Sequence, residues 1–241
     1  MERNPCLSVR KAEGISVPRA QGMNREEVHS YFELLTTALV DNDLVSKPSN
    51  MFSVDETGLQ LNNKPDKVVA IKGSRDVQVI TSGEKEETIL VIACCNAEGN
   101  FLPPYCILKG VNKKAEFSDG MPPGSLVTMS KKSAYVTADI FMDWLKNHFT
   151  PRKPAGKTLI ILHDHSSHMK CYEMLAFAAE NDIMLLCLPS HTTHYLQPLD
   201  RTFFKPLKTY FYQACESWML RNENRKLNRL QFGKLLCEAW S

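Results

Sequence analysis

Residues 184–200 read MLLCLPSHTTHYLQPLD, an apolar run followed by a histidine-rich segment that ends in an acid. The apolar run belongs to the stretch 183–188, which is typical of a central strand buried on both faces of a parallel sheet. The acid, Asp200, begins an amphipathic pattern that predicts a helix from about 199 to 222. The stretch therefore predicts a carboxylate at the start of a helix, where the helix dipole favours a negative charge.

Two other acids have comparable positions in the sequence. Asp55 ends the run 51–54, and Asp164 comes shortly after the unbroken apolar run 159–162. Taken singly, each acid is better explained as a turn or helix-cap residue. Taken together with Asp200, they predict a carboxylate cluster at one edge of a sheet. Such a cluster would hold two divalent cations roughly 3.5–4 Å apart, which stabilise both oxygens of an in-line phosphoryl displacement.

The remaining patterns alternate strands with helices. Asn24 is expected to cap a helix that extends to about Leu39, and Thr137 to cap another. We expect strands at 52–55, 68–71, 88–95, 101–108, 159–162 and 183–188, helices at 138–149, 171–181, 199–222 and 229–240, and a loop at 110–135. Strands that alternate with helices require right-handed crossovers and parallel pairing. The sequence therefore predicts an α/β, ribonuclease H-like fold with a mixed five-stranded sheet and helices on both faces. In that layout the strands that precede Asp55 and Asp164 are neighbours.

The composition is typical of a globular protein in a reducing compartment. Apolar residues make up 43% and charged residues 23% of the 241 residues. No run reaches the ~18 apolar residues of a membrane span, so no membrane partner is expected. The eight cysteines show no Cys-x-x-Cys spacing, which favours buried, reduced thiols. A net charge of +2 is too small to predict nucleic-acid binding, so local basic clusters must carry that inference.

Three segments of the chain resemble one family. Asp55-Glu56-Thr57-Gly58, residues 163–168 and residues 188–200 are similar to the pogo/Tigger branch of the Tc1/mariner-type DDE transposases. That branch also includes jerky-like and centromere-protein-B-like host proteins. The resemblance extends over about residues 50–240, and residues 3–22 resemble the end of the family's helix-turn-helix DNA-binding region. It implies a remnant of that region at 1–22, a helical linker at 23–48 and a DDE endonuclease/transposase catalytic domain at 49–241.

The resemblance also implies an activity. Members of the family use three acids and two magnesium ions to cut DNA at transposon ends and join those ends to a target. The first acid maps to Asp55 and the third to Asp200, so Mg²⁺ or Mn²⁺ is the expected cofactor. DNA is the expected partner, a homodimer is possible, and the expected location is the nucleus.

The second acid leaves two alternatives. The family motif is Asp-x-His-x-Ser-His, and its ungapped match places His163 where the family has the acid. A slip of one residue makes Asp164 the second acid, 35 residues before Asp200, which suits the family's spacing. Either Asp164 completes an active endonuclease, or the chain is a domesticated or decayed relative that binds DNA or chromatin without catalysis.

The histidines permit a third interpretation. His163, Asp164, His165 and His168 form a cluster of the kind that holds zinc in hydrolases, so an unrelated zinc-dependent hydrolase is an alternative. Within the transposase interpretation, the histidines lie around the metal ligands and orient the surrounding loops. The residues assigned this role are His163, His165, His168, His191 and His194. For the last two, an ordinary hydrogen-bonded loop histidine is an equally good explanation.

Two basic clusters are candidates for DNA contact. Lysines and arginines neutralise phosphates without reading base sequence. We expect contacts from a loop and from one face of the last long helix, formed by Lys109, Lys113, Lys114, Arg201, Lys205 and Lys208. A solvated surface suffices to explain Lys131 and Lys132. The aromatic stripe of that helix, Phe203, Phe204, Tyr210 and Phe211, is expected in the core.

Overall fold

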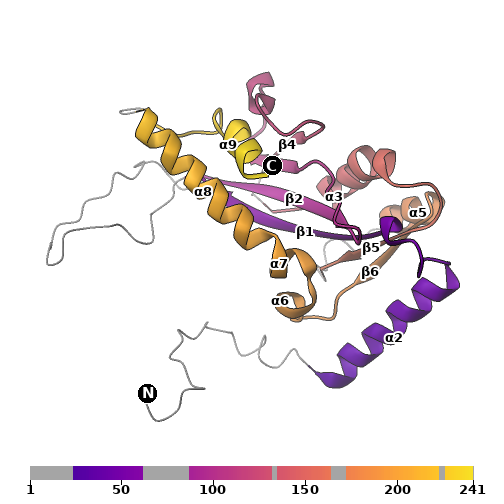
Figure 1. Ribbon diagram of the computed structural model, residues 1–241. Helices are drawn as coiled ribbons and strands as arrows, with labels where there is room; N and C mark the ends of the chain where they lie inside the picture. Colours follow the sequence, from indigo (N-terminus) through magenta and orange to yellow (C-terminus); the bar gives the residue numbers. More distant parts are fainter. Residues whose placement is uncertain (1–23, 62–86, 132–134, 164–171, 223–225, 241) are drawn as a thin grey trace, which may run out of the picture.

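The computed structural model describes residues 24–61, 87–131, 135–163, 172–222 and 226–240 of the chain. Its strands are β1 (Met51–Gln60), β2 (Thr88–Asn96), β3 (Tyr105–Lys109), β4 (Leu126–Ser130), β5 (Thr158–Leu162) and β6 (Ile183–Cys187). They form one mixed sheet in the order β4-β3-β2-β1-β5-β6 (Figure 1). β1 is central, since it pairs antiparallel with β2 and parallel with β5. β6 continues the parallel half, and β4 lies parallel to β3 at the other edge.

Helices cover both faces of this sheet. They are α2 (Arg25–Asp41), α3 (Ala138–Asp143), α5 (Tyr172–Glu180), α6 (Thr193–Leu196), α7 (Pro198–Thr202), α8 (Phe204–Arg221) and α9 (Phe232–Trp240). A π-helix, η3 (Trp144–Phe149), continues α3, and short 3-10 helices occur at η1 (Pro48–Asn50), η2 (Ala115–Ser118) and η4 (Thr150–Arg152). α8 crosses β1 and β2 on one side of the sheet, while α3 and α5 lie on the other (Figure 1).

Alternation along β2 explains the two layers. Val91 and its alternate neighbours pack with α7, α8 and α9, whereas Ile92 and its alternate neighbours pack with α3, η3 and α5. A third cluster joins α2 to β5 and β6, with Tyr31 and Leu44 against Leu159. The core therefore consists of one apolar layer on each face of the sheet, and α2 covers the part of the sheet formed by β5 and β6.

Most of the expected elements are present. The α/β class, with a mixed sheet and helices on both faces, is confirmed, and β1 and β5 are neighbours as predicted. Both predicted caps are confirmed: the Asn24 side chain accepts a hydrogen bond from Glu26 N, and Thr137 accepts one from Ile140 N. The strand expected at 68–71 lies outside the described residues.

The prediction of five strands is wrong, because β4 adds a sixth within the segment 110–135 that was expected to be a loop. β4 is a short edge strand, and it pairs with β3 from Tyr105↔Leu126 to Lys109↔Ser130. The glycines and prolines that precede it mask its short apolar pattern in the sequence. β3 itself begins only at Tyr105, because prolines at 103 and 104 interrupt the expected strand and leave a single bridge from Phe101 to Cys95.

β1 is longer than expected, and the prediction that Asp55 ends a strand is wrong. The strand continues to Gln60 and pairs with β2 along its whole length, from Phe52↔Asn96 to Gln60↔Thr88. Asp55 therefore lies in the middle of a central strand. The polar sequence after Val54 resembles a turn, but both of its faces are covered by helices.

The helix expected at 199–222 is divided at Phe203 into α7 and α8. Phe204 and Phe211 are buried, as expected, whereas Tyr210 is 58% exposed, so its predicted place in the core is wrong. In the described part of the chain, no helix combines the length and the apolar composition of a membrane-spanning segment. None of the six cysteines in these ranges forms a disulfide.

Candidate active site

Asp55 occupies a buried position at the centre of β1. Only 9% of the residue is exposed, and its partner on β2 is Ala93. Side chains alternate along a strand, so Asp55 points to the same face as Ser53 and Thr57, the face covered by α7 and α8. Burial raises the pKa of Asp55 to about 8, and the nearby charges of Glu56 and Asp200 contribute to the increase. A carboxyl group with this pKa is largely protonated near neutral pH.

The end of β5 lies next to Asp55. The parallel register pairs Met51 with Leu159 and Ser53 with Ile161. Continued by two positions, that register brings Asp55 level with His163, one residue after the end of β5. The strand order therefore brings residue 163, at the end of β5, level with the first acid.

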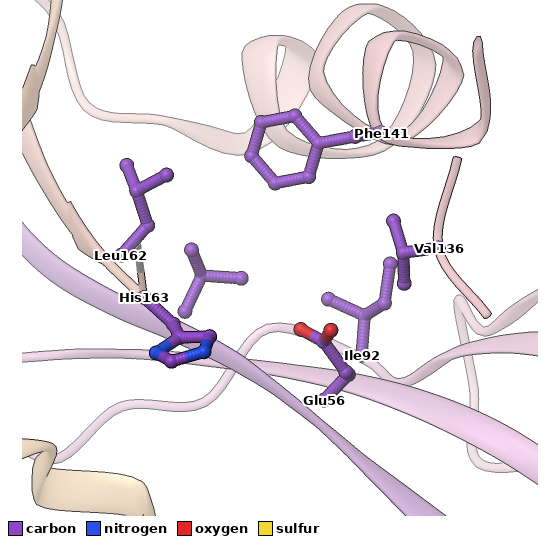
Figure 2. A pocket seen from close by; sticks show the side chains of 7 residues that line it. Glu56, Ile92, Val136, Phe141, Leu162 and His163 are labelled. Atoms are coloured by element: carbon purple, nitrogen blue, oxygen red, sulfur yellow. The ribbon is translucent and has the colours of Figure 1, made fainter. Parts of the chain in front are cut away.

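His163 is directed into a small pocket on the α3 side of the sheet. It lines this pocket together with Glu56, Val54, Phe141 and other apolar side chains. Figure 2 shows the His163 ring and the Glu56 carboxylate pointing toward one another below Phe141. Glu56 belongs to the opposite face of β1 from Asp55, so the structure groups His163 with Glu56 rather than with Asp55. Asp164, His165 and His168 lie outside the described residues.

Asp200 is presented by the short helix α7, on the same side of the sheet as Asp55. Its side chain is exposed, whereas the preceding residue, Leu199, is 1% exposed and packs in the core with Phe204 and Leu207. The effect of Asp200 on the pKa of Asp55 shows that the two carboxylates interact electrostatically. Two of the three predicted acids are therefore brought together.

The segment before Asp200 is attached to β1 by a buried glutamine. Gln197 is fully buried, and its Nε2 donates to the Val54 carbonyl oxygen at 3.1 Å. Its Oε1 accepts a hydrogen bond from Ser53 Oγ. Thr192 is also fully buried, and its hydroxyl donates to the Pro189 carbonyl oxygen at 2.6 Å, which closes the turn before α6. These interactions hold the loop between β6 and α7 against β1.

Sequence reasoning missed Gln197, Ser53 and Glu56. An amide or hydroxyl between apolar residues shows no preference for burial in a sequence, because its burial depends on a partner far along the chain. The sole signal at 197 is its place in a run that leads to an acid. For Glu56 the signal is strand alternation, which becomes visible only when β1 is known to continue past Asp55.

The remaining predicted histidines differ in their surroundings. His191 is exposed and has a φ of 64°, in the left-handed region. The His194 ring lies 4.1 Å from the Tyr195 ring, measured between centroids, and its two nitrogens are enclosed without a hydrogen-bond partner among the described residues. Their role in orienting the loops stays a prediction.

The described ranges contain no group of three or more His, Cys, Asp or Glu side chains arranged to hold a metal ion. The zinc cluster and the second acid both depend on positions outside these ranges. The donors that are described, Asp55 and Asp200, are carboxylates, and such oxygen donors suit Mg²⁺ or Mn²⁺ better than zinc. The residues present therefore fit the predicted cofactor.

The predicted DNA-contacting residues form two separate groups. Arg201 and Lys205 are exposed and Lys208 is half-buried, on α7 and α8 directly after Asp200. Lys109 ends β3, level with Gln60 by the strand register and therefore ~16 Å past Asp55 along the sheet. Lys113 and Lys114 are exposed in the loop that follows. The structure thus places only the α7–α8 group beside the acids.

The sequence of residues 86–240 matches a protein family described as DDE superfamily endonuclease. A human protein named "Pogo transposable element with KRAB domain" is 26% identical over 175 residues, which cover 71% of this chain and 28% of that protein. A Cochliobolus lunatus protein named "MFS-type transporter clz9" is 28% identical over 191 residues, which cover 76% of this chain and 20% of that protein. The chain thus spans less than a third of the length of these curated relatives.

Solved structures show the same fold. The "Mos1 transposase paired-end complex with left transposon end" has a TM-score of 0.56 at 13% identity, covering 99% of this chain and 67% of that one. The Mos1 mariner paired-end complexes with Mn and with Mg also have TM-scores of 0.56, at 13% and 12% identity, and cover 99% of this chain and 67% and 66% of those chains. The likeness confirms the ribonuclease H-like fold.

Proposed function

Because the chain belongs to the DDE superfamily of endonucleases, as its resemblance to the pogo/Tigger-type transposases predicted, we propose that residues 49–241 form a metal-dependent DNA-cutting domain. The proximity of Asp55 to Asp200 carries this proposal, since two acids 145 residues apart interact on one face of the sheet. When bound, two divalent ions would supply charge stabilisation for the attacking and leaving oxygens of a phosphodiester.

We assign the second acid to Asp164. The register brings the end of β5 beside Asp55, and His163 lines the pocket on the opposite face with Glu56. An imidazole also carries no negative charge, and its nitrogen suits Mg²⁺ less well than a carboxylate oxygen. Asp55, Asp164 and Asp200 would together hold Mg²⁺ or Mn²⁺.

The chain's own residues have three tasks in this reaction. Asp55 would hold a cation in its ionised form, so metal binding would be coupled to the release of its proton. The sheet and α7 hold the carboxylates in place before DNA arrives. Arg201, Lys205 and Lys208 neutralise phosphates beside the acids, and Lys109, Lys113 and Lys114 would contact DNA farther along the sheet. The partner would be genomic DNA in the nucleus, bound by one copy or by a homodimer.

Nicking of supercoiled DNA in Mg²⁺ or Mn²⁺ tests this function. We expect wild-type activity, and its loss by at least ~100-fold in Asp55→Ala and in Asp164→Ala, because metal stabilisation of the transition state is worth several kcal/mol. Asp139→Ala is the matched control, since it removes an exposed acid from the first turn of α3 on the other side of the sheet.

A second candidate function follows from the histidine at 163, where the family motif has an acid. A decayed relative would bind DNA without cutting it. Inactive wild-type protein that gains nicking activity on His163→Asp would establish this alternative and refute the assignment of Asp164. Nicking that survives Asp55→Ala would refute the three-acid site altogether.

A further inference from the structure

We propose that Gln197 is a positioning residue, which sets the separation of Asp55 and Asp200 through its hydrogen bonds to β1. This inference rests on the proposed function, because it assumes that the two acids share metal ions. The amide of Gln197 is fully buried and uses both of its ends: Nε2 donates to Val54 O at 3.1 Å, and Oε1 accepts from Ser53 Oγ.

The two ends of this link lie close to the two acids. Ser53 precedes Asp55 by two residues, so their side chains share one face of β1, and Val54 is the residue between them. Gln197 precedes Asp200 by three residues, which is about one helical turn. Its own carbonyl oxygen accepts a hydrogen bond from Arg201 N at 3.2 Å, within the first turn of α7. One side chain thus joins the strand of the first acid to the helix of the third.

The side chain of Gln197 is placed where it could cap the N-terminus of α7, but it does not do so. It stands at the N-cap position, yet it makes no capping hydrogen bond to the helix. It reaches instead to the carbonyl of Val54, one position beyond Ser53, where the β1–β5 register ends. The contact therefore extends the restraint on β1 just past the point where β5 stops pairing.

Apolar packing does not supply the same restraint. Leu199 anchors α7 in the core, but hydrophobic contact is non-directional and permits small rotations of a short helix. Two hydrogen bonds from a planar amide fix both distance and orientation. Metal ligands need placement to within ~0.5 Å, so this restraint is expected to affect metal affinity before it affects folding.

Binding of Mn²⁺ to the full chain, followed by the electron paramagnetic resonance of free and bound Mn²⁺, tests the inference without a nicking assay. Gln197→Met removes both hydrogen bonds at nearly constant volume. We expect it to raise the Kd for Mn²⁺ by about 10–100-fold, the range found when a group that orients a metal ligand is lost. The spectrum of bound Mn²⁺ should also change, and the chain should still unfold cooperatively.

Two further variants separate positioning from general destabilisation. Ser53→Ala should weaken Mn²⁺ binding, and Ser53→Thr, which keeps the hydroxyl, should restore it. The double variant of Ser53→Ala and Gln197→Met should bind no more weakly than Gln197→Met alone, because both act through one contact. Gln231→Met is the matched control, since Gln231 accepts a hydrogen bond from Asn228 N just before α9.

The outcomes distinguish this inference from the proposed function. Wild-type affinity for Mn²⁺ in Gln197→Met and Ser53→Ala would overturn the positioning role and leave the three-acid site standing. Absence of Mn²⁺ binding in the wild type would overturn the three-acid site, and the positioning role with it. If Gln197→Met fails to fold, the Ser53→Ala and Ser53→Thr pair decides the question.

Discussion

The two described acids are held in place by different means. Asp55 belongs to a ten-residue central strand, and its position follows from backbone pairing with β2 along the whole of β1 and with β5 up to Ser53. Asp200 belongs to a five-residue helix, attached through the burial of Leu199 and the hydrogen bonds of Gln197. The first acid is therefore fixed by the sheet itself, and the third by side chains that can be replaced one at a time.

The largest effect on stability is expected from Leu199→Ala. This side chain is 1% exposed and anchors α7 in the core, so its truncation should lower the free energy of unfolding by ~2–5 kcal/mol. Urea denaturation measures the loss, with Pro198→Ala at the exposed neighbouring position as the control. A loss below ~1 kcal/mol would show that the burial of Leu199 does not hold α7. The proposed difference, in which the sheet fixes Asp55 and side chains fix Asp200, would then lose its support.

Asp55→Asn should raise the free energy of unfolding, and the size of the increase should depend on pH. The pKa of Asp55 is about 8 in the folded protein and 3.8 as its ordinary value. Between these values the folded carboxyl keeps a proton that the unfolded chain releases, so the metal-free wild type loses stability as pH rises. The asparagine avoids that loss, so we expect the free energy of unfolding of Asp55→Asn to exceed that of the wild type by on the order of 2–4 kcal/mol at pH 8.

At pH 4 the same substitution should raise the free energy of unfolding by less than ~1 kcal/mol, because pH 4 is close to the ordinary pKa of 3.8 and the carboxyl of the unfolded chain is then only about half ionised. Thermal unfolding in a chelator at the two pH values makes the measurement. An equal gain at both would mean that packing, not ionisation, governs the Asp55 position.

The surroundings of the two acids also differ in charge, since the basic residues flank only Asp200. Arg201→Gln combined with Lys205→Gln should reduce the slope of log K against log salt by ~2, at about 0.9 per lost phosphate contact. Fluorescence anisotropy with a DNA duplex at several salt concentrations gives the slope. Lys131→Gln, at an exposed position just after β4, should leave it unchanged. If the double variant and Lys131→Gln gave the same slope, the proposal that DNA lies over α7 would be refuted.

Asp200→Asn should change stability least of all. The side chain is exposed, so we expect the metal-free protein to unfold within ~0.5 kcal/mol of the wild type. Any change in the free energy of unfolding at pH 8 should be an increase. The charge of Asp200 contributes to the raised pKa of Asp55, so its removal makes the ionised form of Asp55 less unfavourable in the folded protein. Denaturation in urea at pH 8 checks this. A large loss of stability would mean that Asp200 supports the fold in its own right.

The sequence predicted those features that depend on runs of residues. The apolar run before Asp164 and the alternation of strands with helices were enough to make β1 and β5 neighbours. The positions of Asp55 and Asp200 in the sequence, together with the family resemblance, predicted both as site residues. Strand order accounts for the end of β5 beside Asp55, whereas the approach of Asp200 also depends on the side chains that hold α7 against β1.

Features that depend on coverage by distant residues were not predictable. The segment after Val54 resembles a turn in isolation, and it becomes a strand because β2 pairs with it and helices cover it. β4 is stabilised by β3 rather than by its own pattern. The partner of Gln197 is more than 140 residues away, so no local signal distinguishes a buried amide from an exposed one.

The alternation of side chains along β1 has a consequence for how this segment can change during evolution. Ser53, Asp55 and Thr57 serve the layer of α7 and α8, while Val54 and Glu56 serve the α3 layer. An insertion or deletion of one residue would exchange the two sets and turn the acid away from Asp200. We expect natural variants of this segment to differ by substitution and never in length.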